Sequence, residues 1–439
     1  MGIFDNFPIM NAYSVNLDWI IKTVKNALAE WETVKNEFDN LEEFVRNYFA
    51  NLDVTEEVDK KLEEMYANGE LAELISEYRN AVTLEMFGAV GDGVADDSEA
   101  FNNAIKSGSK ILLFGKTYYL KTVELIDGCN IEGTEESVFK MGHGAVVSNC
   151  TIKRVTFDQN GNDFGFKENV TVEDCVFSNA GIAIQGHPEG MKKCIIKNCE
   201  FENNKICDIY TAYTTEDVII ENCHLLSNGT SHNIRIYNGY RCKIMGNTVG
   251  NSGGGFGIVL ANSTFCIVDS NIVYDTYLEA INLNNSSQVT VSNNICTWAI
   301  SAGTDFGISV FGETQGCNYN HIVNNKIYNC AKAGINLERM CGYNIVSGNI
   351  VQDCCRVHDG YAASETCVFI YSEDVVAGCI RNIIENNIFH YSRSHIKYTV
   401  HDSEKGYQNI IRNNTAVNFV GKIDGEQDIS SGNNFTASP

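Results

Sequence analysis

Four carboxylates in the second half of the chain have side chains suited to hydrolysis of a glycosidic bond. That reaction uses two carboxyl groups roughly 5 to 9.5 Å apart, one donating a proton and the other acting as base or nucleophile. We expect Glu338 to be one of them and Asp305 or Asp359 the other, with Glu365 as a further candidate. Because acidic residues are frequent in this chain, each assignment competes with an ordinary solvated carboxylate.

Aromatic and amide residues recur around these carboxylates and would suit a carbohydrate ligand. Aromatic rings pack on sugar C–H faces, while amides and acids bind hydroxyl groups. Segments such as "AINL", "GISV", "GINL" and "CVFI" align in two outward columns, one of Asn284, Phe311, Glu338 and Tyr371, the other of Asn282, Ser309, Asn336, Phe369 and Lys397. The predicted glycan contacts are Phe311, Tyr371, Phe369, Asn336, Asn282, Arg356 and His358. At each position, an ordinary exposed residue between coils is the alternative.

A polysaccharide lyase is the alternative reaction. It needs a base that removes the proton next to a uronic carboxylate, often with a cation or calcium ion to neutralise that carboxylate. Arg356, His358 and Lys397 have the required groups. A serine or cysteine nucleophile is not indicated, because the sequence has no nucleophile elbow. We expect no metal site and no cofactor, because paired ligands at zinc-like spacing are absent.

Repeated segments from about residue 150 to the end would position these residues, for example "IIKNCEF", "IIENCHL", "KIMGNTV" and "IIENNIF". Their alignment gives a column of Val155, Cys175, Cys199, Cys223, Asn247, Asn271, Asn294, Asn325, Asn349, Asn387 and Asn414. The position three residues earlier is always β-branched, which favours a strand: Ile152, Val172, Ile196, Ile220, Ile244, Val268, Val291, Ile322, Val346, Ile384 and Ile411. The position just before the Cys/Asn column is mainly Asn, Gly, Asp or Ser, which tolerate a left-handed bend.

A third short strand recurs between the corners, so each repeat of about 24 residues contains three strands and no helix. Such a unit buries its apolar face only by stacking on its neighbours. The pattern predicts a mainly β, single-stranded solenoid, a parallel β-helix with about 4.8 Å between rungs. Its inward Asn column would form a hydrogen-bond ladder. A leucine-rich solenoid is the competing fold, but its leucine spacing and helical half-repeat are missing.

Two steps in the repeat are longer than the others and predict loops on the solenoid wall. Asn294 to Asn325 spans 31 residues and Asn349 to Asn387 spans 38, against about 24 elsewhere. Insertions of this kind often build a binding face. Their ionisable residues are Asp305, Glu313, Asp353, Arg356, His358, Asp359, Glu365, Glu373 and Asp374.

The first 80 residues have a helical pattern. From Leu17 to Leu52, apolar residues recur at steps of four and three, flanked by Glu, Lys and Asn. This spacing is close to the heptad seam of a coiled coil. We predict a parallel coiled coil, and an amphipathic helix packed on its own domain is the alternative.

The stretch "FGAVGDGVADDSEAFNNAI", residues 87–105, contains the carboxylates Asp92, Asp96 and Asp97. We expect Asp96 or Asp97 to cap a helix that starts near Ser98, because a carboxylate there accepts backbone N–H bonds and meets the positive end of the helix dipole. A calcium site is the alternative, although a full ligand loop is missing. The cluster is therefore predicted to begin the fold rather than to do the chemistry.

Followed by "ILLFGKTYYL", this stretch resembles the N-terminal capping module of the pectate-lyase-like, right-handed parallel β-helix superfamily. The matching residues are Gly91, Asp92, Gly93, Asp96, Asp97, Ala100 and Phe101. Phe114 stands where the superfamily usually has a proline. The leader segment "VTEEVDKKLEEMYANGELAELI" is similar to N-terminal segments of tail-spike and appendage proteins from phages of Gram-positive hosts. The motif is fairly specific for the fold and weakly specific for the reaction.

The amino-acid composition argues against some classes of binding partner. With 56 acidic against 32 basic residues and a formal charge of −24, the chain would repel nucleic acid and anionic membrane surfaces. The sequence has no run of about 18 consecutive apolar residues, so we do not expect membrane insertion. The N-terminus, "MGIFDNFPIM", lacks an ordinary signal-peptide pattern. The 17 cysteines lie mostly in strand-like segments, so we interpret them as small core residues of a protein made in a reducing cytoplasm. Disulfides or zinc binding are the alternative.

The resemblance implies a virion tail appendage, synthesised in the host cytoplasm and assembled as a homotrimer. Residues 1–80 would form the helical leader that attaches to other virion tail proteins and trimerises, 81–128 the capping module, and 129–439 the β-helix that recognises and cleaves a host cell-surface glycan. Hydrolysis is preferred to the lyase reaction. The alternatives are a receptor-binding adhesin without catalysis and a structural tail component without glycan affinity.

Overall fold

The computed structural model describes Met65, Ala67, Gly69 and residues 81–439, except 135, 298–305, 358, 373–377, 393–394, 404–407, 419–422, 425–428 and 437–439. The chain divides into two units between Leu71 and Ala72. The predicted coiled coil lies outside the described residues. Within the described ranges, no helix is both long and apolar enough to cross a membrane.

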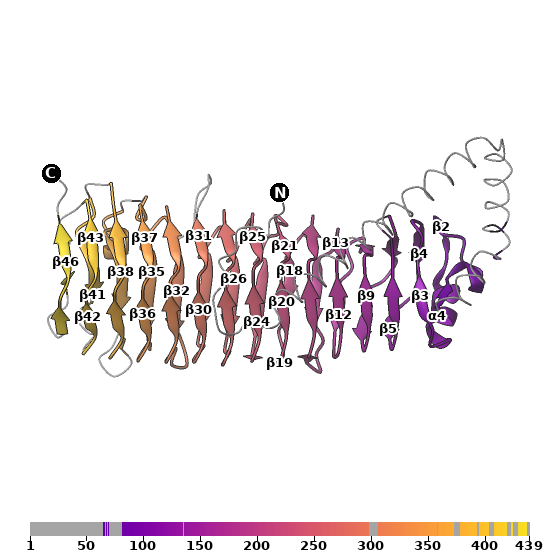
Figure 1. Ribbon diagram of the computed structural model, residues 1–439, viewed down its shortest axis with the longest axis horizontal. Helices are drawn as coiled ribbons and strands as arrows, with labels where there is room; N and C mark the ends of the chain where they lie inside the picture. Colours follow the sequence, from indigo (N-terminus) through magenta and orange to yellow (C-terminus); the bar gives the residue numbers. More distant parts are fainter. Residues whose placement is uncertain are drawn as a thin grey trace, which may run out of the picture. The chain divides into compact units, whose positions relative to one another are not determined.

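The second unit is a stack of short strands that follow one another along its long axis (Figure 1). Each rung supplies strands in turn to three sheets, which we name sheets A, B and C. Strands of successive rungs pair in parallel and in register, as where Val268 lies opposite Val291. This arrangement confirms the predicted parallel β-helix. The described rungs contain none of the helical half-repeats that a leucine-rich solenoid would need.

The strands of each sheet are given in spatial order. Sheet A contains β1 (Ala81–Thr83), β3 (Lys110–Leu112), β6 (Asn130–Glu132), β9 (Thr151–Lys153), β12 (Thr171–Glu173), β16 (Ile195–Lys197), β20 (Ile219–Glu221), β24 (Lys243–Met245), β27 (Ile267–Asp269), β30 (Thr290–Ser292), β33 (His321–Val323), β36 (Ile345–Ser347), β39 (Ile383–Glu385), β42 (Ile410–Arg412) and β45 (Ile429–Ser431). Sheet B contains β2 (Asp92–Asp96), β4 (Thr117–Leu120), β7 (Val138–Met141), β10 (Thr156–Asp158), β13 (Val176–Ser178), β17 (Glu200–Glu202), β21 (His224–Leu225), β25 (Thr248–Gly250), β28 (Ile272–Tyr274), β31 (Ile295–Thr297), β34 (Lys326–Tyr328), β37 (Ile350–Gln352), β40 (Ile388–His390), β43 (Thr415–Val417) and β46 (Asn434–Thr436).

Sheet C forms the third wall of the solenoid. It contains β5 (Leu125–Asp127), β8 (Val146–Ser148), β11 (Phe164–Phe166), β14 (Ile182–Gly186), β18 (Cys207–Tyr210), β22 (Ile234–Tyr237), β26 (Ile258–Ala261), β29 (Ile281–Asn284), β32 (Ile308–Gly312), β35 (Ile335–Arg339), β38 (Thr366–Tyr371), β41 (Tyr398–Asp402) and β44 (Ile423–Asp424). A small fourth sheet joins β15 (Met191–Lys192), β19 (Thr215–Glu216) and β23 (Gly239–Tyr240). The described helices are η1 (Glu85–Phe87), α4 (Ser98–Lys106) and η2 (Ala362–Ser364).

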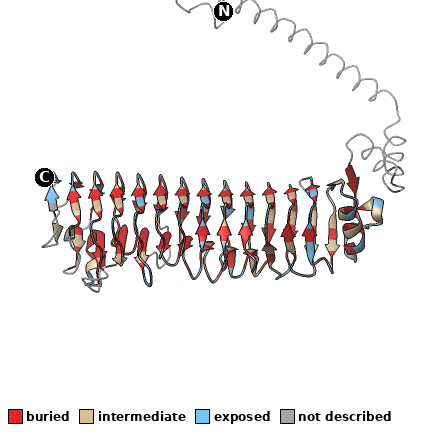
Figure 2. Ribbon diagram, turned by 90° about the horizontal axis from the view of Figure 1, so that it is seen from below, coloured by how far each residue is buried: buried red, intermediate tan, exposed pale blue. Residues whose placement is uncertain are grey.

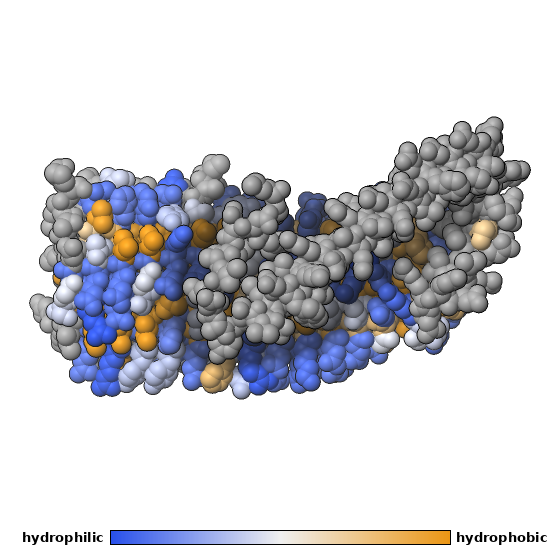
Figure 3. All heavy atoms as spheres, in the orientation of Figure 1, coloured by the Kyte–Doolittle hydropathy of each residue, from blue (hydrophilic) through white to orange (hydrophobic). Residues whose placement is uncertain are grey.

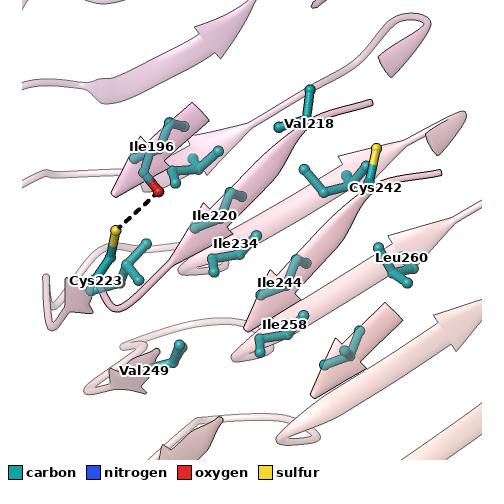
Figure 4. Close-up of a cluster of buried hydrophobic side chains, with 14 of the residues drawn as sticks. Ile196, Val218, Ile220, Cys223, Ile234, Cys242, Ile244, Val249, Ile258 and Leu260 are labelled. Atoms are coloured by element: carbon teal, nitrogen blue, oxygen red, sulfur yellow. Dashed lines mark hydrogen bonds between the residues drawn. The ribbon is translucent and has the colours of Figure 1, made fainter. Parts of the chain in front are cut away.

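The interior is filled from rung to rung by the predicted β-branched column of sheet A. From Ile152 to Ile411 these residues pair in register and are at most 1 % exposed. Buried positions repeat along the whole solenoid in Figure 2, and Figure 4 shows Ile220 and Ile244 close to residues of the other sheets. Burial of one such side chain contributes roughly 1.5 to 3 kcal/mol. All seventeen cysteines are buried free thiols, as expected for small core residues.

The corner between sheets A and B has the predicted left-handed bend in every repeat, for example at Asn222 (φ 54°) and Ser270 (φ 57°). Just after it, the inward amides form a ladder: the backbone N–H and Nδ2 of Asn294 both donate to Oδ1 of Asn325, at 2.9 and 3.0 Å. The ladder thereby satisfies backbone groups that burial would otherwise leave unpaired. A second ladder was not predicted and lies at the corner between sheets C and A, at Asn320, Asn344, Asn382 and Asn409.

The acidic cluster near the start of the solenoid organises its own loop. Oδ1 of Asp96 accepts hydrogen bonds from the backbone N–H of Ser98, the first residue of α4, and from its hydroxyl at 2.5 Å. Asp97 is the N-cap by position, but its buried carboxylate turns back to the N–H groups of Val90 and Gly91. The capping prediction therefore holds for Asp96. Asp97 instead closes the preceding turn.

We predict that Asn325→Leu destabilises the solenoid by roughly 1 to 3 kcal/mol, because the buried N–H of Asn294 loses its acceptor. The free energy of unfolding measured in urea would check this. Lys326→Leu adds the same side chain at the exposed start of β34 and serves as the control. Equal stability of Asn325→Leu and the wild type would contradict the structural role of the ladder.

Asp208 is an unusual carboxyl group because it is fully buried. Its carboxylate oxygens accept hydrogen bonds from the neutral side-chain amides of Asn204 (2.9 Å) and Asn233 (3.2 Å), and Ser227 is a further neutral hydrogen-bond partner. Burial raises the pKa of Asp208 above its ordinary value of 3.8, because the charged form is desolvated. A raised folded-state pKa means that the group's contribution to stability is present below pH 3.8 and is lost as pH rises through the folded-state pKa.

We therefore predict that Asp208→Asn becomes progressively more stable relative to the wild type as pH rises from below 3.8. The measurement is the difference in unfolding free energy between the two proteins across a pH series. The sign of the slope is the test, since any constant offset reflects the changed hydrogen bonds alone. A difference that stays flat with pH would show that the pKa of Asp208 is the same in the folded and unfolded states, which would contradict the effect of burial.

Candidate functional site

A groove crosses the outer face of sheet C over five consecutive rungs, β22 to β35. Its volume is about 520 Å³. Outward side chains of successive rungs line up in rows on a solenoid, and Figure 3 shows rows of like hydropathy on the side of the molecule that faces the viewer. The residues that line the groove are His232, Arg235, Tyr237, Phe256, Val259, Ala261, Asn262, Glu279, Asn282, Asn284, Asn285, Ser309, Phe311, Glu313, Thr314 and Glu338.

The hollow results from side-chain size along two outward columns. In the first column, Arg235 is followed by Val259 and Asn282 on the next rungs. In the second, Tyr237 is followed by Ala261. Small residues thus form the floor, with Arg235 and Tyr237 at one end. At the other end, Phe311 and Glu338 rise on β32 and β35.

The rim near β32 is held by one amide. Oδ1 of Asn285 accepts hydrogen bonds from the backbone N–H groups of Glu313, Thr314 and Gln315, at 2.7 to 3.1 Å. Asn285 has φ +48°, a left-handed conformation that asparagine tolerates. The side chain of Asn285 therefore fixes the loop that brings Glu313 to the groove.

Glu338 is held at the β35 end of the groove. Its Oε2 accepts a hydrogen bond from Nδ2 of Asn336 at 3.1 Å, and its Oε1 lies 3.9 Å from Nε of Arg339. The Arg339 guanidinium also lies over the ring of Phe311, 4.8 Å from the ring centroid. Glu338 retains a quarter of its side-chain exposure. It is therefore positioned by neighbours and still open to a ligand.

The first predicted outward column is correct in full, since Asn284, Phe311, Glu338 and Tyr371 pair in turn. The second is correct from Asn282 to Phe369, and its prediction of Lys397 is wrong. His401 lies opposite Phe369, because Val400 is the inward residue that pairs with Val368. Lys397 precedes that strand.

A second cluster lies beyond the groove, where the loop that ends in η2 meets β38. Tyr361 contacts Phe369 at 5.5 Å between ring centroids, and Phe369 stacks on Tyr371 at 5.9 Å. The pKa of Tyr361 is raised by burial and, after that, by the charges of Glu338, Tyr371 and Asp359. Glu338 and Asp359, two of the predicted catalytic residues, therefore act on the same hydroxyl group.

Asp359 and Glu365 differ in environment. Oδ1 of Asp359 accepts hydrogen bonds from the Ser364 hydroxyl (2.7 Å) and the Tyr361 N–H (3.0 Å). These bonds hold the pKa of the exposed Asp359 below its ordinary value. Glu365 is buried, and its Oε2 forms an ion pair with Nζ of Lys397 at 2.7 Å. The environment of Glu365 fits a loop anchor better than a catalytic group.

Of the remaining predicted site residues, the described ones, Arg356, Asn336 and Phe369, do not line the groove. Asp305 and His358 lie outside the described residues. Arg356 is exposed on the loop before η2. Asn336 and Phe369 are almost completely buried on the outer face of sheet C, so they support the site rather than offer a free surface.

The sequence analysis missed several groove residues, among them His232, Arg235 and Glu279. Nδ1 of His232 accepts a hydrogen bond from the Phe256 N–H at 3.1 Å, which leaves the other ring nitrogen, Nε2, as the donor. Burial, together with the charge of Arg235, lowers the pKa of His232 to about 4. The imidazole is therefore neutral at physiological pH.

Comparisons with known proteins agree with this architecture. The family model described as a right handed beta helix region matches residues 119–296 and 232–416. No curated protein matches the sequence significantly. Among solved structures, the A-module of the mannuronan C-5 epimerase AlgE6 from Azotobacter vinelandii aligns with a TM-score of 0.59 at 14% identity, covering 81% of this chain and 100% of that one.

Two further structures have similar solenoids. The Dettilon tailspike protein has a TM-score of 0.54 at 16% identity, covering 80% of this chain and 69% of its own. The catalytic domain of Agl-KA has a TM-score of 0.52 at 14% identity, covering 82% of this chain and 68% of its own. At such identities the likeness concerns the fold. Because the family model matches most of the solenoid, the chain belongs to the right-handed β-helix family.

Proposed function

We propose that this chain is a phage tail appendage whose β-helix binds a host cell-surface polysaccharide and cleaves it by hydrolysis. The observation that carries the proposal is the groove on sheet C, in which Asn284, Phe311 and Glu338 share one outward column in register. One similar structure is a tailspike protein and another a mannuronan epimerase, which is compatible with a glycan ligand.

The proposed role in a virion also involves the parts of the chain that lie outside the groove. We propose that residues 1–80 attach to other tail proteins and form a homotrimer. Residues 81–128 would cap the solenoid, and residues 129–439 would carry the glycan site. The capping role fits the contacts of Asp96 and Asp97 at the start of α4.

The side chains that line the groove are suited to binding a sugar polymer. The ring of Phe311 offers an apolar surface for sugar C–H groups, and Asn284 and Glu313 offer hydrogen-bonding groups for hydroxyls. The floor of Val259 and Ala261 leaves room above the sheet. A long groove open to solvent admits a chain rather than only a single sugar.

For hydrolysis we propose Glu338 as the general acid and Asp359 as its partner. Glu338 would donate its proton to the leaving glycosidic oxygen. Asp359 would accept a proton from the water whose oxygen bonds to the anomeric carbon. The lowered pKa of Asp359 keeps that carboxylate ionised, as a base requires. Burial and, after it, the charges of both groups raise the pKa of Tyr361.

One observation favours the second candidate function, a receptor-binding adhesin without catalysis. The carboxylate of Asp359 already accepts two hydrogen bonds within its loop, which is sufficient reason for an aspartate at this position. An adhesin would need the aromatic and amide wall but no partner for Glu338.

We predict that the full chain releases oligosaccharides from its envelope polysaccharide and that Glu338→Gln slows this release at least about 100-fold with binding retained. Fragments are sized by mass spectrometry, and absorbance detects unsaturated ends. Glu202→Gln, an exposed carboxylate on sheet B, is the matched control. Unsaturated ends on the fragments would indicate a lyase. Binding of the polysaccharide without released fragments would contradict catalysis and favour the receptor-binding adhesin.

We further predict that Phe311→Ala weakens polysaccharide binding by roughly three- to tenfold, because one aromatic contact is removed. Affinity measured by biolayer interferometry on immobilised polysaccharide gives the comparison. Phe265→Ala removes an exposed ring at a corner of the solenoid outside the groove and should bind like the wild type. Similar losses in both variants would place the glycan elsewhere.

A further inference from the structure

Arg235 occupies the β22 end of the groove with its guanidinium among aromatic rings. The guanidinium carbon lies 5.4 Å from the ring centroid of Tyr210 and 5.9 Å from that of Tyr237. The Nε atom of Arg235 is buried and has no hydrogen-bond acceptor within the described part of the chain. The aromatic rings offset part of the cost of desolvating this cation.

Arg235 differs from several other arginines on the solenoid, which have acidic partners. Arg241 lies 2.7 Å from a carboxylate oxygen of Asp217, and Arg412 lies 2.7 Å from one of Glu385. No ion pair joins Arg235 to any carboxylate among the described residues. In a chain with 56 acidic and 32 basic residues, potential partners are abundant. A partly buried cation without a counter-charge is costly unless a ligand supplies one.

His232 complements this cation in the same end of the groove. Its Nδ1 is occupied by the Phe256 N–H, so its Nε2–H is the group left to donate. The side chain is a neutral donor beside a charged one. Together, an imidazole N–H and a guanidinium match an oxyanion that accepts several hydrogen bonds.

Acidic groove residues confine an anion to this end. Glu279 precedes β29, Glu313 follows β32, and Glu338 lies on β35, whereas Arg235 lies on β22. With a rung spacing of about 4.8 Å, Glu279 is about two rungs, or roughly 10 Å, along the axis from the rung of Arg235. An anionic substituent is therefore attracted at the β22 end and repelled at the β35 end.

We propose that Arg235 and His232 form a subsite for an anionic sugar unit, with a uronic carboxylate or a phosphate substituent as the charged group. This inference rests on the proposed glycan-binding function and names the chemical class of the polymer. The polymer would be acidic, and its charged unit would lie over β22 with the chain continuing toward β35.

The first experiment tests the subsite without knowledge of the polymer. Full-length protein labelled with ¹⁵N-arginine is titrated with glucuronate, glucose 6-phosphate and glucose, and guanidinium resonances are followed by NMR. The Arg235 resonance is assigned by its loss in Arg235→Gln. We expect glucuronate, glucose 6-phosphate or both to shift it at millimolar concentration, and glucose to leave it unchanged. The active probe identifies the charged group.

The control resonance in this titration belongs to Arg241, which is assigned with Arg241→Gln and is already paired with Asp217. It should not respond to any of the three sugars. No shift of the Arg235 resonance with either charged sugar, or an equal shift with glucose, would overturn the subsite.

The second experiment uses a polysaccharide that the wild-type chain binds, in its native form and after chemical reduction of its carboxyl groups or removal of its phosphates. Arg235→Gln should bind the native polymer at least tenfold more weakly than the wild type, whereas Arg241→Gln should not differ. Both wild type and Arg235→Gln should bind the neutralised polymer equally. Undiminished binding of the native polymer by Arg235→Gln would overturn the inference.

The two experiments separate failure of the inference from failure of the proposed function. If charged sugars shift the Arg235 resonance but no envelope polysaccharide binds, the anion subsite stands and the polysaccharide function falls. If a polysaccharide binds equally well before and after neutralisation, the function stands and the anionic specificity is wrong.

Discussion

The structure depends on one constraint: a rung of three short strands cannot bury its apolar face alone, so every rung must align with the next. Backbone hydrogen bonds between parallel strands fix this register, and the inward residues from Ile152 to Ile411 fill the space that results. The corner amides make the alignment stricter, because Oδ1 of Asn325 accepts the backbone N–H of Asn294 on the preceding rung. A slip of one residue would break the packing and the ladder together.

The same register determines the outer surface. Once the inward residues are aligned, the residues between them lie in outward columns at rung spacing, whatever their types. A groove can then form wherever smaller residues stand between larger ones, as Ala261 and Asn284 stand between Tyr237 and Phe311. Substitutions on this wall leave the core unchanged. The fold can therefore acquire a binding site without losing its stability.

The sequence alone was sufficient to predict the structural features that follow from the constant spacing of the repeat. Inward residues, left-handed corners and the column that contains Glu338 were all predictable, because their spacing is constant. Lys397 was misplaced because the segment between β40 and β41 has no repeat to set its length, and the strand begins at Tyr398. The second ladder had a visible signal, an asparagine just before each of the sheet A strands β33, β36, β39 and β42.

His232 and Arg235 were harder to predict, since the search for chemistry began at carboxylates near the long insertions. Extending the column backward from Asn282 through Val259 leads to Arg235, but nothing in the sequence shows that this arginine lacks a carboxylate partner. Only the spatial arrangement reveals that it lies among aromatic rings. The surroundings of a charged side chain depend on residues from several rungs, whereas the position of a strand follows from the repeat of a single rung.

The groove is electrostatically asymmetric, and its length is set by the number of rungs. Arg235 and Glu338 lie four rungs apart, roughly 19 Å at the usual spacing between parallel strands. If a charged unit of the polymer bound at Arg235, the glycosidic bond that reaches Glu338 would lie several sugars away along the chain. Binding and cleavage would then be linked by a fixed distance, because stacked rungs neither stretch nor slide. In a solenoid, the spacing between an anchoring group and a reacting group is counted in rungs.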